Sequence, residues 1–349
     1  MSDALPRQLY SLVKPRIVAL LCVTGAFAAL AAGGAPVGVL ASFLAAGALV
    51  AGGSAALNCW YDRRLDRHME RTADRPLPSG RLDHRVALAF AVGLLAAGAA
   101  VGAATLPRES VAYMLAGAAS YVGLYTVLLK RRHWLGVVLG GSAGSFPVLA
   151  GWTAVRPLAP EAVVLAAVVF AWTPAHAWAL ATVYREDFAA AGVPTLPVVA
   201  SRRTVRRAVW TSALATVAVA AAAVPLAPAP YAVTLAVAGG LFLAAFRAFH
   251  RDGGDATAVG AFFASNLFLA VLFVAWGAGG ALGGVDAAGR GIAVATTVAA
   301  FACLWRARPA LRGVDAAPAG EYLAAAGIPG RLAEYVRDND HPRHAPNSD

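Results

Sequence analysis

Three oxygen-bearing side chains, Asn58, Asp62 and Asp66, recur at a spacing of four residues at the end of an apolar run. On a helix, residues four apart lie on one face, one turn apart. Like charges at that spacing repel each other, and a divalent cation would turn the repulsion into coordination. Amide and carboxylate oxygens without soft ligands suit Mg²⁺, which also binds substrate phosphates. The alternative is a solvated helix face neutralised by nearby arginines, but bare acids are costly at a membrane edge, which favours the site.

Arginines follow these residues within the same stretch, which reads NCWYDRRLDRHMERTADRPLPSG over 58–80. A guanidinium group presents a fixed fork of donors that matches the geometry of phosphate. Mg²⁺ ligands beside Arg71 and Arg75 would therefore hold a diphosphate. The alternative is that the stretch is basic only because cytoplasmic loops of membrane proteins are basic.

A second acidic stretch begins near Tyr184, again at the end of an apolar run. Asp187 is the stronger candidate for an acid that faces the first set, because Glu186 has a ready partner in Arg185. The two stretches would then form a two-sided clamp around a diphosphate. Tyr184, one turn before Asp187, is placed to hydrogen-bond a phosphate oxygen, or it belongs to the interfacial aromatic belt.

Three further candidates lie apart from the acidic stretches. Lys130 and Arg131 end another apolar run and either reach the same diphosphate or serve as topology anchors. His176 lies inside an apolar run, where an ionisable residue is a functional candidate by default. The alternative for His176 is a core histidine bonded to a neighbouring carbonyl group.

The elements that must position these residues are membrane-spanning helices. Of the 349 residues, 59% are hydrophobic and 14% are charged, against roughly 25% charged residues in an average soluble chain. Apolar runs of about 20 residues match the hydrocarbon core of a bilayer. The sequence therefore predicts an all-α, polytopic transmembrane helical bundle. The nine predicted spans, with a tenth candidate at 291–305, lie at 17–35, 37–57, 86–106, 110–129, 135–153, 161–182, 208–227, 230–247 and 258–279.

The distribution of basic residues predicts the orientation of these spans. With a cytoplasmic N-terminus and ten spans, all but three of the 29 Lys and Arg residues fall on the cytoplasmic side, the exceptions being Arg108, Arg156 and Arg290. The positive-inside rule predicts this asymmetry, and we expect a multi-pass protein of the cell inner membrane with its acidic stretches on the cytoplasmic side. Topology and anionic ligands account for the net charge of +10, so we expect no nucleic-acid partner.

On this interpretation the chain divides into four parts. Residues 1–16 form a cytoplasmic N-terminus, 17–280 the transmembrane domain, 281–307 an additional segment with the tenth candidate span, and 308–349 a polar cytoplasmic tail. The first apolar run is long enough to remain as a span, and we expect no cleavable signal peptide. Cys22, Cys59 and Cys303 are far apart, and we expect free thiols.

At the residues above, the chain resembles the UbiA superfamily of membrane prenyltransferases, and within it the branch that farnesylates haem. The first stretch fits N-x3-D-x3-D followed by M-x-R-T-x-x-R-P-L-P-x-G, and the second fits W-x-x-P-H-x-x-A-L-A followed by D-[YF]-x-x-A-G-V-P-x-L-P-V-V. The K-P-R at 14–16, the L-K-R-R and G-G-x-A-G within 129–144, and SNLFLAVLFVAW at 265–276 fit as well. The resemblance covers about residues 9–280.

The resemblance implies a UbiA-type domain that transfers a farnesyl group from farnesyl diphosphate to a vinyl group of haem B, giving haem O. Mg²⁺ is the implied cofactor, and haem B, farnesyl diphosphate, the lipid bilayer and a downstream haem A synthase are the implied partners. The implied catalytic residues are Asp62, Asp66 and Asp187. The implied Mg²⁺ ligands are these three and Asn58. The implied diphosphate-binding residues are Arg71, Lys130, Arg131 and Tyr184. The implied haem-binding residues are His176, Arg75 and Arg16.

Two other functions fit parts of the sequence. A UbiA-type enzyme with an aromatic or quinone-precursor acceptor would share the loop chemistry, and an assay that offers both acceptors with one labelled donor separates the two. A multi-span transporter would also be helical and basic on its inner side. Transporters place their binding groups near the bilayer midplane, however, whereas the acidic residues here cluster at helix ends.

Overall fold

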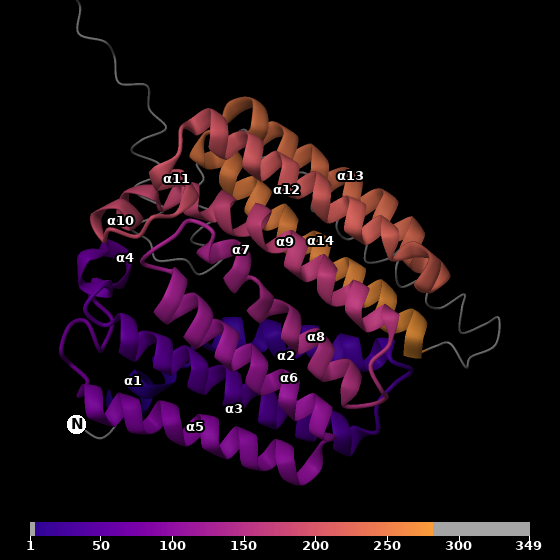
Figure 1. Cartoon of the computed structure of the whole chain (residues 1–349), viewed down its shortest axis with the longest axis horizontal. Helices are drawn as coiled ribbons and strands as arrows, with labels where there is room; N and C mark the ends of the chain where they lie inside the picture. Colours follow the sequence, from indigo (N-terminus) through magenta and orange to yellow (C-terminus); the bar gives the residue numbers. More distant parts are fainter. Residues whose placement is uncertain (1–3, 282–349) are drawn as a thin grey trace, which may run out of the picture.

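The computed structural model describes residues 4–281, and this part of the chain folds into helices without a strand (Figure 1). The helices are α1 Ala4–Leu12, α2 Pro15–Ala31, α3 Val37–Asp62, η1 Asp66–His68, α4 Glu70–Ala73, α5 His84–Thr105, α6 Arg108–Ala119, η2 Ser120–Leu129, α7 Gly136–Gly140, α8 Ser142–Thr153, α9 Pro160–Val183, α10 Arg185–Ala190, α11 Leu196–Val199, α12 Arg202–Ala222, η3 Val224–Leu226, α13 Ala229–Asp252 and α14 Asp255–Ala281. The predicted all-α fold is confirmed.

Seven helices in the described part are long and apolar enough to cross a membrane, counting α6 and its continuation η2 as one. The predicted span at 17–35 corresponds to α2, which with α1 forms a pair bent by 47° that would make an eighth. The predicted span at 135–153 is not one helix, because the chain breaks at Gly141, between α7 and α8. The tenth candidate at 291–305 lies outside the described residues. The chain is therefore a multi-pass membrane protein in which one predicted span is broken.

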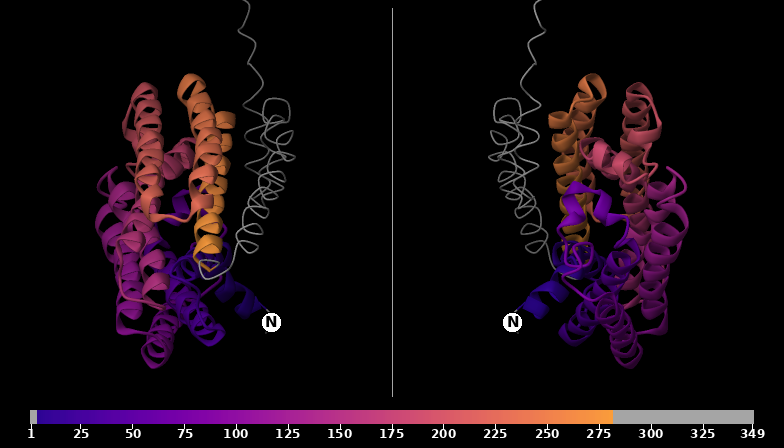
Figure 2. Two further views of the ribbon diagram at one scale, coloured as in Figure 1. Left: turned by 90° about the vertical axis from the view of Figure 1, so that its right-hand side faces the viewer. Right: turned by 90° about the vertical axis from the view of Figure 1, so that its left-hand side faces the viewer.

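The long helices run alongside one another as one bundle (Figures 1 and 2). α3 pairs with α5, α9 with α12, α13 with α14, and α8 packs on α2 and α6. α14 reaches back to α2, so the last described helix closes the bundle against the first long one. The largest apolar core lies among α8, α9, α12, α13 and α14 and includes Phe242, Phe246, Phe268 and Trp276. The short helices α4, α10 and α11 gather at one end of the bundle.

The contact between α2 and α8 depends on glycine. A Cβ atom added at Gly151 would collide with the backbone carbonyl oxygen of Gly25, and a Cβ at Gly25 would meet Phe43 and the carbonyl of Pro147. Small residues let membrane helices approach closely, and dispersion then stabilises the packing. The backbones of α2 and α8 can touch here only because neither residue has a side chain.

We expect Gly151→Ala to destabilise the folded protein by about 1–3 kcal/mol, because backbone atoms cannot move aside as side chains can. Thermal unfolding of the purified protein, followed by tryptophan fluorescence, measures the effect. Gly93→Ala on α5 is the matched control, since nothing lies within 4 Å of its added Cβ. An equal loss of stability in both variants would contradict close packing at Gly151.

Candidate functional site

Asp62 is the last residue of α3 and one of the most buried acids described, with 1% of its surface exposed. Its carboxylate accepts hydrogen bonds from Lys130 Nζ at 2.5 Å and from Arg131 Nη2 at 3.1 Å. Asn58 Nδ2, one turn earlier on the same helix face, also donates to it at 2.9 Å. The structure thus brings Asn58, Asp62, Lys130 and Arg131 together, as a shared diphosphate site requires.

Asn58 is oriented by two residues that had no predicted role in the site. Its Oδ1 accepts from Lys14 Nζ at 2.7 Å, and its Nδ2 also donates to Thr126 Oγ1 at 3.1 Å. Thr126 lies in η2, a stretch of π-helix, and bonds the Tyr121 carbonyl five residues back at 2.8 Å. π-helical turns are rare and are often found at functional sites. Local sequence patterns do not indicate a π-helical turn, so the sequence did not predict that Thr126 contacts Asn58.

Lys14 has an unusual backbone. Its φ of 51° and ψ of 61° place it in the left-handed region, where it is the one non-glycine residue with positive φ among those described. The following Pro15 also restricts Lys14. Strained residues of this kind persist where surrounding contacts hold them, often at functional sites. The bend between α1 and α2 thereby delivers the Lys14 ammonium group to Asn58. The Lys-Pro pair was the available sequence signal.

Asp66 does not continue the helix face of Asn58 and Asp62. A continuous helix through all three was the condition for placing them on one face, and α3 instead ends at Asp62, leaving Asp66 in the 3₁₀ turn η1. Its carboxylate is buried and lies 3.4 Å from Arg75 Nη1. Its carbonyl accepts from Thr72 Oγ1 at 2.8 Å. Tertiary contacts, which a local pattern cannot reveal, set the turn.

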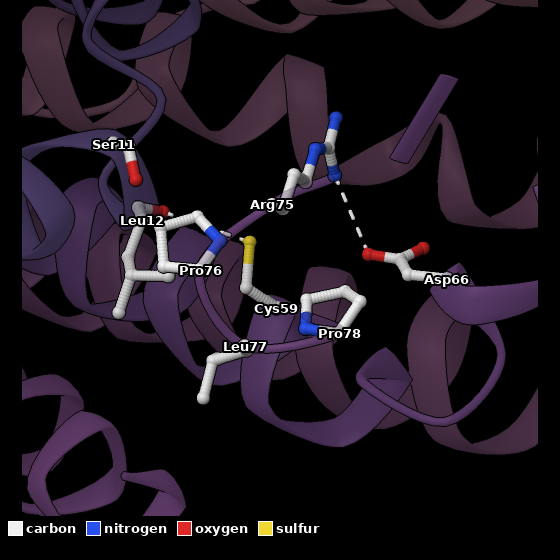
Figure 3. A pocket seen from close by; sticks show the side chains of 8 residues that line it. All are labelled: Ser11, Leu12, Cys59, Asp66, Arg75, Pro76, Leu77 and Pro78. Atoms are coloured by element: carbon white, nitrogen blue, oxygen red, sulfur yellow. Dashed lines mark hydrogen bonds and ion pairs between the residues drawn. The ribbon is translucent and has the colours of Figure 1, made fainter. Parts of the chain in front are cut away.

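A small cavity adjoins this ion pair (Figure 3). It has a volume of about 110 Å³ and lies between Asp66, Arg75 and Cys59 on one side and Leu12 on another. Arg75, which was predicted to bind haem, is therefore an immediate neighbour of the acidic set. Cys59 is a free thiol, as is Cys22, in agreement with the sequence. Cys303 lies outside the described residues.

The two acidic loops meet at one end of the bundle (Figure 1). The backbone N–H of Glu70 donates to Asp187 Oδ1 at 3.2 Å, and Arg71 Nε lies 4.0 Å from Asp187 Oδ2. A small apolar cluster of Leu65, Met69 and Val193 joins the same loops. The clamp anticipated from the sequence therefore has its two sides in contact.

Tyr184 takes part in this junction through Arg71, whose guanidinium carbon lies 4.8 Å from the centre of the tyrosine ring. Burial raises the pKa of the Tyr184 phenol above its ordinary value, so the hydroxyl group stays protonated and able to donate. Partial desolvation at the loop junction, with help from the neighbouring Arg75, lowers the pKa of the Arg71 guanidinium, whose side chain keeps 31% of its surface exposed. A partly desolvated cation beside a second cation gains from the approach of an anion.

The last two predicted residues, His176 and Arg16, lie on the helices α9 and α2. His176 sits within α9, where its Nδ1 is 2.7 Å from Ser265 Oγ of α14 and its ring stacks on Trp172. Arg16 is exposed in the first turn of α2. The contacts of His176 involve none of the acidic residues, so the structure separates a polar loop cluster from a histidine held among aromatic rings. Ser265 had no predicted role in the site, because only the packing of α14 on α9 brings it to His176.

The four predicted Mg²⁺ ligands are hard oxygen donors, and three of them, Asn58, Asp62 and Asp66, are buried. Within residues 4–281, no three His, Cys, Asp or Glu side chains cluster closely enough to hold a metal ion by themselves. Mg²⁺ that takes one or two carboxylates and completes its shell with phosphate oxygens and water needs no such cluster. The residues therefore fit a cation that arrives together with a diphosphate.

Comparison with family models and named relatives adds independent findings. A model described as the UbiA prenyltransferase family matches residues 19–267. A protein of Mycobacterium avium named protoheme IX farnesyltransferase is 41% identical over 283 residues, which cover 78% of this chain and 91% of that protein. A protein of the same name from Roseiflexus sp. is 40% identical over 272 residues, or 76% of this chain and 51% of that protein. The chain thus spans about half the length of the Roseiflexus relative.

Solved structures share the fold. A digeranylgeranylglyceryl phosphate synthase matches with a TM-score of 0.67 at 16% identity, over 79% of this chain and 98% of that one. A UbiA homolog from Archaeoglobus fulgidus, bound to DMAPP and Mg²⁺, matches with a TM-score of 0.59 at 19% identity, over 78% of this chain and 99% of that one.

Proposed function

Because the chain belongs to the UbiA prenyltransferase family, we propose that it transfers a farnesyl group from farnesyl diphosphate to a vinyl group of protoheme IX, producing haem O and diphosphate. The observation that carries the proposal is the meeting of the two acidic loops, in which Asp187 accepts from the Glu70 N–H and lies beside Arg71. The names of the relatives that are about 40% identical support the choice of acceptor.

The proposed reaction begins with cleavage of the bond between C1 of the farnesyl group and the diphosphate oxygen, which leaves with the bonding electrons. The vinyl group of the porphyrin attacks the resulting allylic cation and forms the new carbon–carbon bond. Water adds to the cation that this attack creates and loses a proton. The products are hydroxyethylfarnesyl porphyrin, diphosphate and a proton, so atoms and charge balance.

The chain's basic residues would stabilise the charge that grows on the leaving diphosphate. Lys130 and Arg131 are now paired with Asp62, and Arg71 with Asp187, so an incoming diphosphate with its cation can exchange partners with these pairs. Donors arranged in advance around a developing charge usually make the largest catalytic contribution. Mg²⁺ held by Asn58, Asp62, Asp66 and Asp187 would supply further neutralisation of the diphosphate oxygens.

Other parts of the bundle would bind the acceptor and control when water enters the site. The apolar walls of the bundle would cover the prenyl chain and exclude water until the carbon–carbon bond has formed. His176 would contact the haem, and Arg75 and Arg16 would receive its propionates. From the distribution of Lys and Arg, we infer that the loops lie on the cytoplasmic side of the inner membrane. We also propose that a haem A synthase consumes the product.

The test is incubation of the purified chain with haem B, farnesyl diphosphate and Mg²⁺, followed by mass spectrometry of the porphyrin. We expect the mass of the porphyrin to increase by that of one farnesyl group plus one water molecule, less the one proton that the added water loses. Chelation of the divalent cation by EDTA should abolish the product, and added Mg²⁺ should restore it. An aromatic acid acceptor offered with the same labelled donor is the control. Transfer to that acceptor and not to haem B would refute the proposed substrate.

A further inference from the structure

The side chain of His176 is held between α9 and α14 by several contacts. Its ring stacks on Trp172, with ring centres 4.0 Å apart, and on Phe262, with centres 4.5 Å apart. Its Nδ1 lies 2.7 Å from Ser265 Oγ. Trp172 Nε1 in turn donates to the Ser265 carbonyl oxygen at 2.9 Å, so the two helices are joined at the same place. The imidazole ring therefore has a defined orientation.

The Ser265 hydroxyl group has one proton, and its two short contacts decide where that proton lies. Ser265 Oγ is 2.6 Å from the carbonyl oxygen of Phe262, one turn earlier on α14. Oxygen atoms approach this closely when a proton lies between them, and a carbonyl oxygen cannot donate, so the hydroxyl group donates to Phe262. The proton between Ser265 and His176 must then come from the histidine Nδ1.

This assignment determines the chemistry of the other ring nitrogen. Neutral imidazole carries one N–H group, so a proton on Nδ1 leaves a lone pair on Nε2. The ring lies between two apolar helices and beside Ser265, which is 0% exposed, so a charged imidazolium would lose hydration here. A hydrogen bond that fixes one ring nitrogen as donor prepares the other nitrogen to bind a metal ion.

We propose that Ser265 is a positioning residue that holds His176 as the Nδ1–H tautomer, so that Nε2 can ligate the iron of the substrate porphyrin. The inference rests on the proposed function, because it takes haem B as the substrate. Ser265 acts through His176 and does not touch the porphyrin. Its effect should therefore be visible in the iron–histidine bond itself, which a merely structural serine would not change.

The test is titration of the purified full-length chain in lipid nanodiscs with haem B, without farnesyl diphosphate, followed by absorption and resonance Raman spectroscopy of ferrous haem. Wild-type protein should show an iron–histidine stretching band that His176→Ala loses. Ser265→Ala should weaken haem affinity by about 10-fold and shift the band, because the hydrogen bond that orients the ring and strengthens Nε2 is gone. Ser265→Cys, which keeps the volume but accepts weakly, should shift the band in the same direction.

Ser110→Ala is the matched control. Ser110 is also 0% exposed, and its hydroxyl group also donates between helices, to the Ala150 carbonyl oxygen at 2.8 Å. It should leave the band and the haem affinity unchanged. The affinity of Ser265→Ala for farnesyl diphosphate reports whether that variant is folded. If this affinity is lost, the iron–histidine band of Ser265→Cys is used to test the role of Ser265.

Three results would overturn the role of Ser265. They are a wild-type protein without the band, a serine variant with the wild-type band and affinity, and an equal loss of haem affinity in Ser110→Ala. The band with its predicted shifts, in a protein that never forms farnesylated porphyrin, would refute the proposed function and support the role of Ser265.

Discussion

An Asp62→Asn variant should insert and fold but lose farnesyl transfer by on the order of 10²- to 10³-fold, the typical cost of removing one preorganised electrostatic group. The buried carboxylate holds both Lys130 and Arg131 and is the central predicted metal ligand. Asn keeps the shape and one acceptor oxygen but lacks the charge. Asp62→Ala would leave two cations without their acceptor and is the less informative change, because the penalty of unpaired buried charge falls on folding. Turnover in membranes with saturating Mg²⁺ measures the effect.

Asp83→Asn provides the control for the same chemical change. Asp83 caps the start of α5, where its carboxylate accepts from the Arg85 N–H at 2.6 Å, and asparagine caps helices equally well. That hydrogen bond also lowers the pKa of Asp83 below its ordinary value. We expect wild-type turnover from Asp83→Asn. Normal turnover in Asp62→Asn, at the protein level of the wild type, would reject Asp62 as part of the site.

Asp187→Asn should also lower turnover by about 10²-fold or more while changing stability by no more than about 1 kcal/mol. The small stability effect is expected because Arg71 and Asp187 are partly exposed and lie 4.0 Å apart, at the limit of an ion pair. The large activity effect is expected because Asp187 is the acid that the second loop brings to the first. Farnesyl diphosphate affinity at several Mg²⁺ concentrations should show a weaker dependence on the cation than in wild type.

The matched control for this variant is Asp252→Asn. Asp252 lies in the last turn of α13, where its carboxylate accepts from the Gly254 N–H and the Thr257 hydroxyl group. Its carboxylate accepts a backbone N–H, as that of Asp187 does, but from a nearby residue and outside the loop junction. A stability loss in Asp187→Asn that matches the loss of activity would mean that Asp187 only ties the loops together.

The part of the site that repeats along one helix could be predicted from the sequence. Asn58 and Asp62 lie one turn apart on α3, as their spacing indicates, and the basic residues that follow η2 do reach Asp62. Asp187 meets the first loop as anticipated. Asp62, Asp187 and the basic residues after η2 carry charge at helix ends, where a charged residue in a membrane protein is conspicuous whatever its tertiary surroundings.

The rest depends on geometry that no local pattern encodes. The left-handed backbone of Lys14 brings its ammonium group to Asn58. A π-helical turn brings the Thr126 hydroxyl group to the same asparagine. The predicted span at 135–153 breaks at a close contact between helices, where a Cβ at Gly140 would press on Tyr125 and one at Gly141 on Thr173. The hydropathy of residues 135–153 indicates only a continuous apolar run. Such contacts arise between helices that are distant in the sequence, and they appear only once the helices are packed.

The closure of the bundle has a consequence for how the protein is made. α2 leaves the ribosome early, yet its neighbours include α8 and α14, and Gly277 of α14 comes close to Phe27 of α2. Until those helices have been inserted, the glycine-bearing face of α2 is open to lipid, where membrane chaperones and proteases can recognise it. A nascent chain that stops before α14 would leave that face of α2 uncovered, so we expect it to be degraded faster than a chain that includes α14.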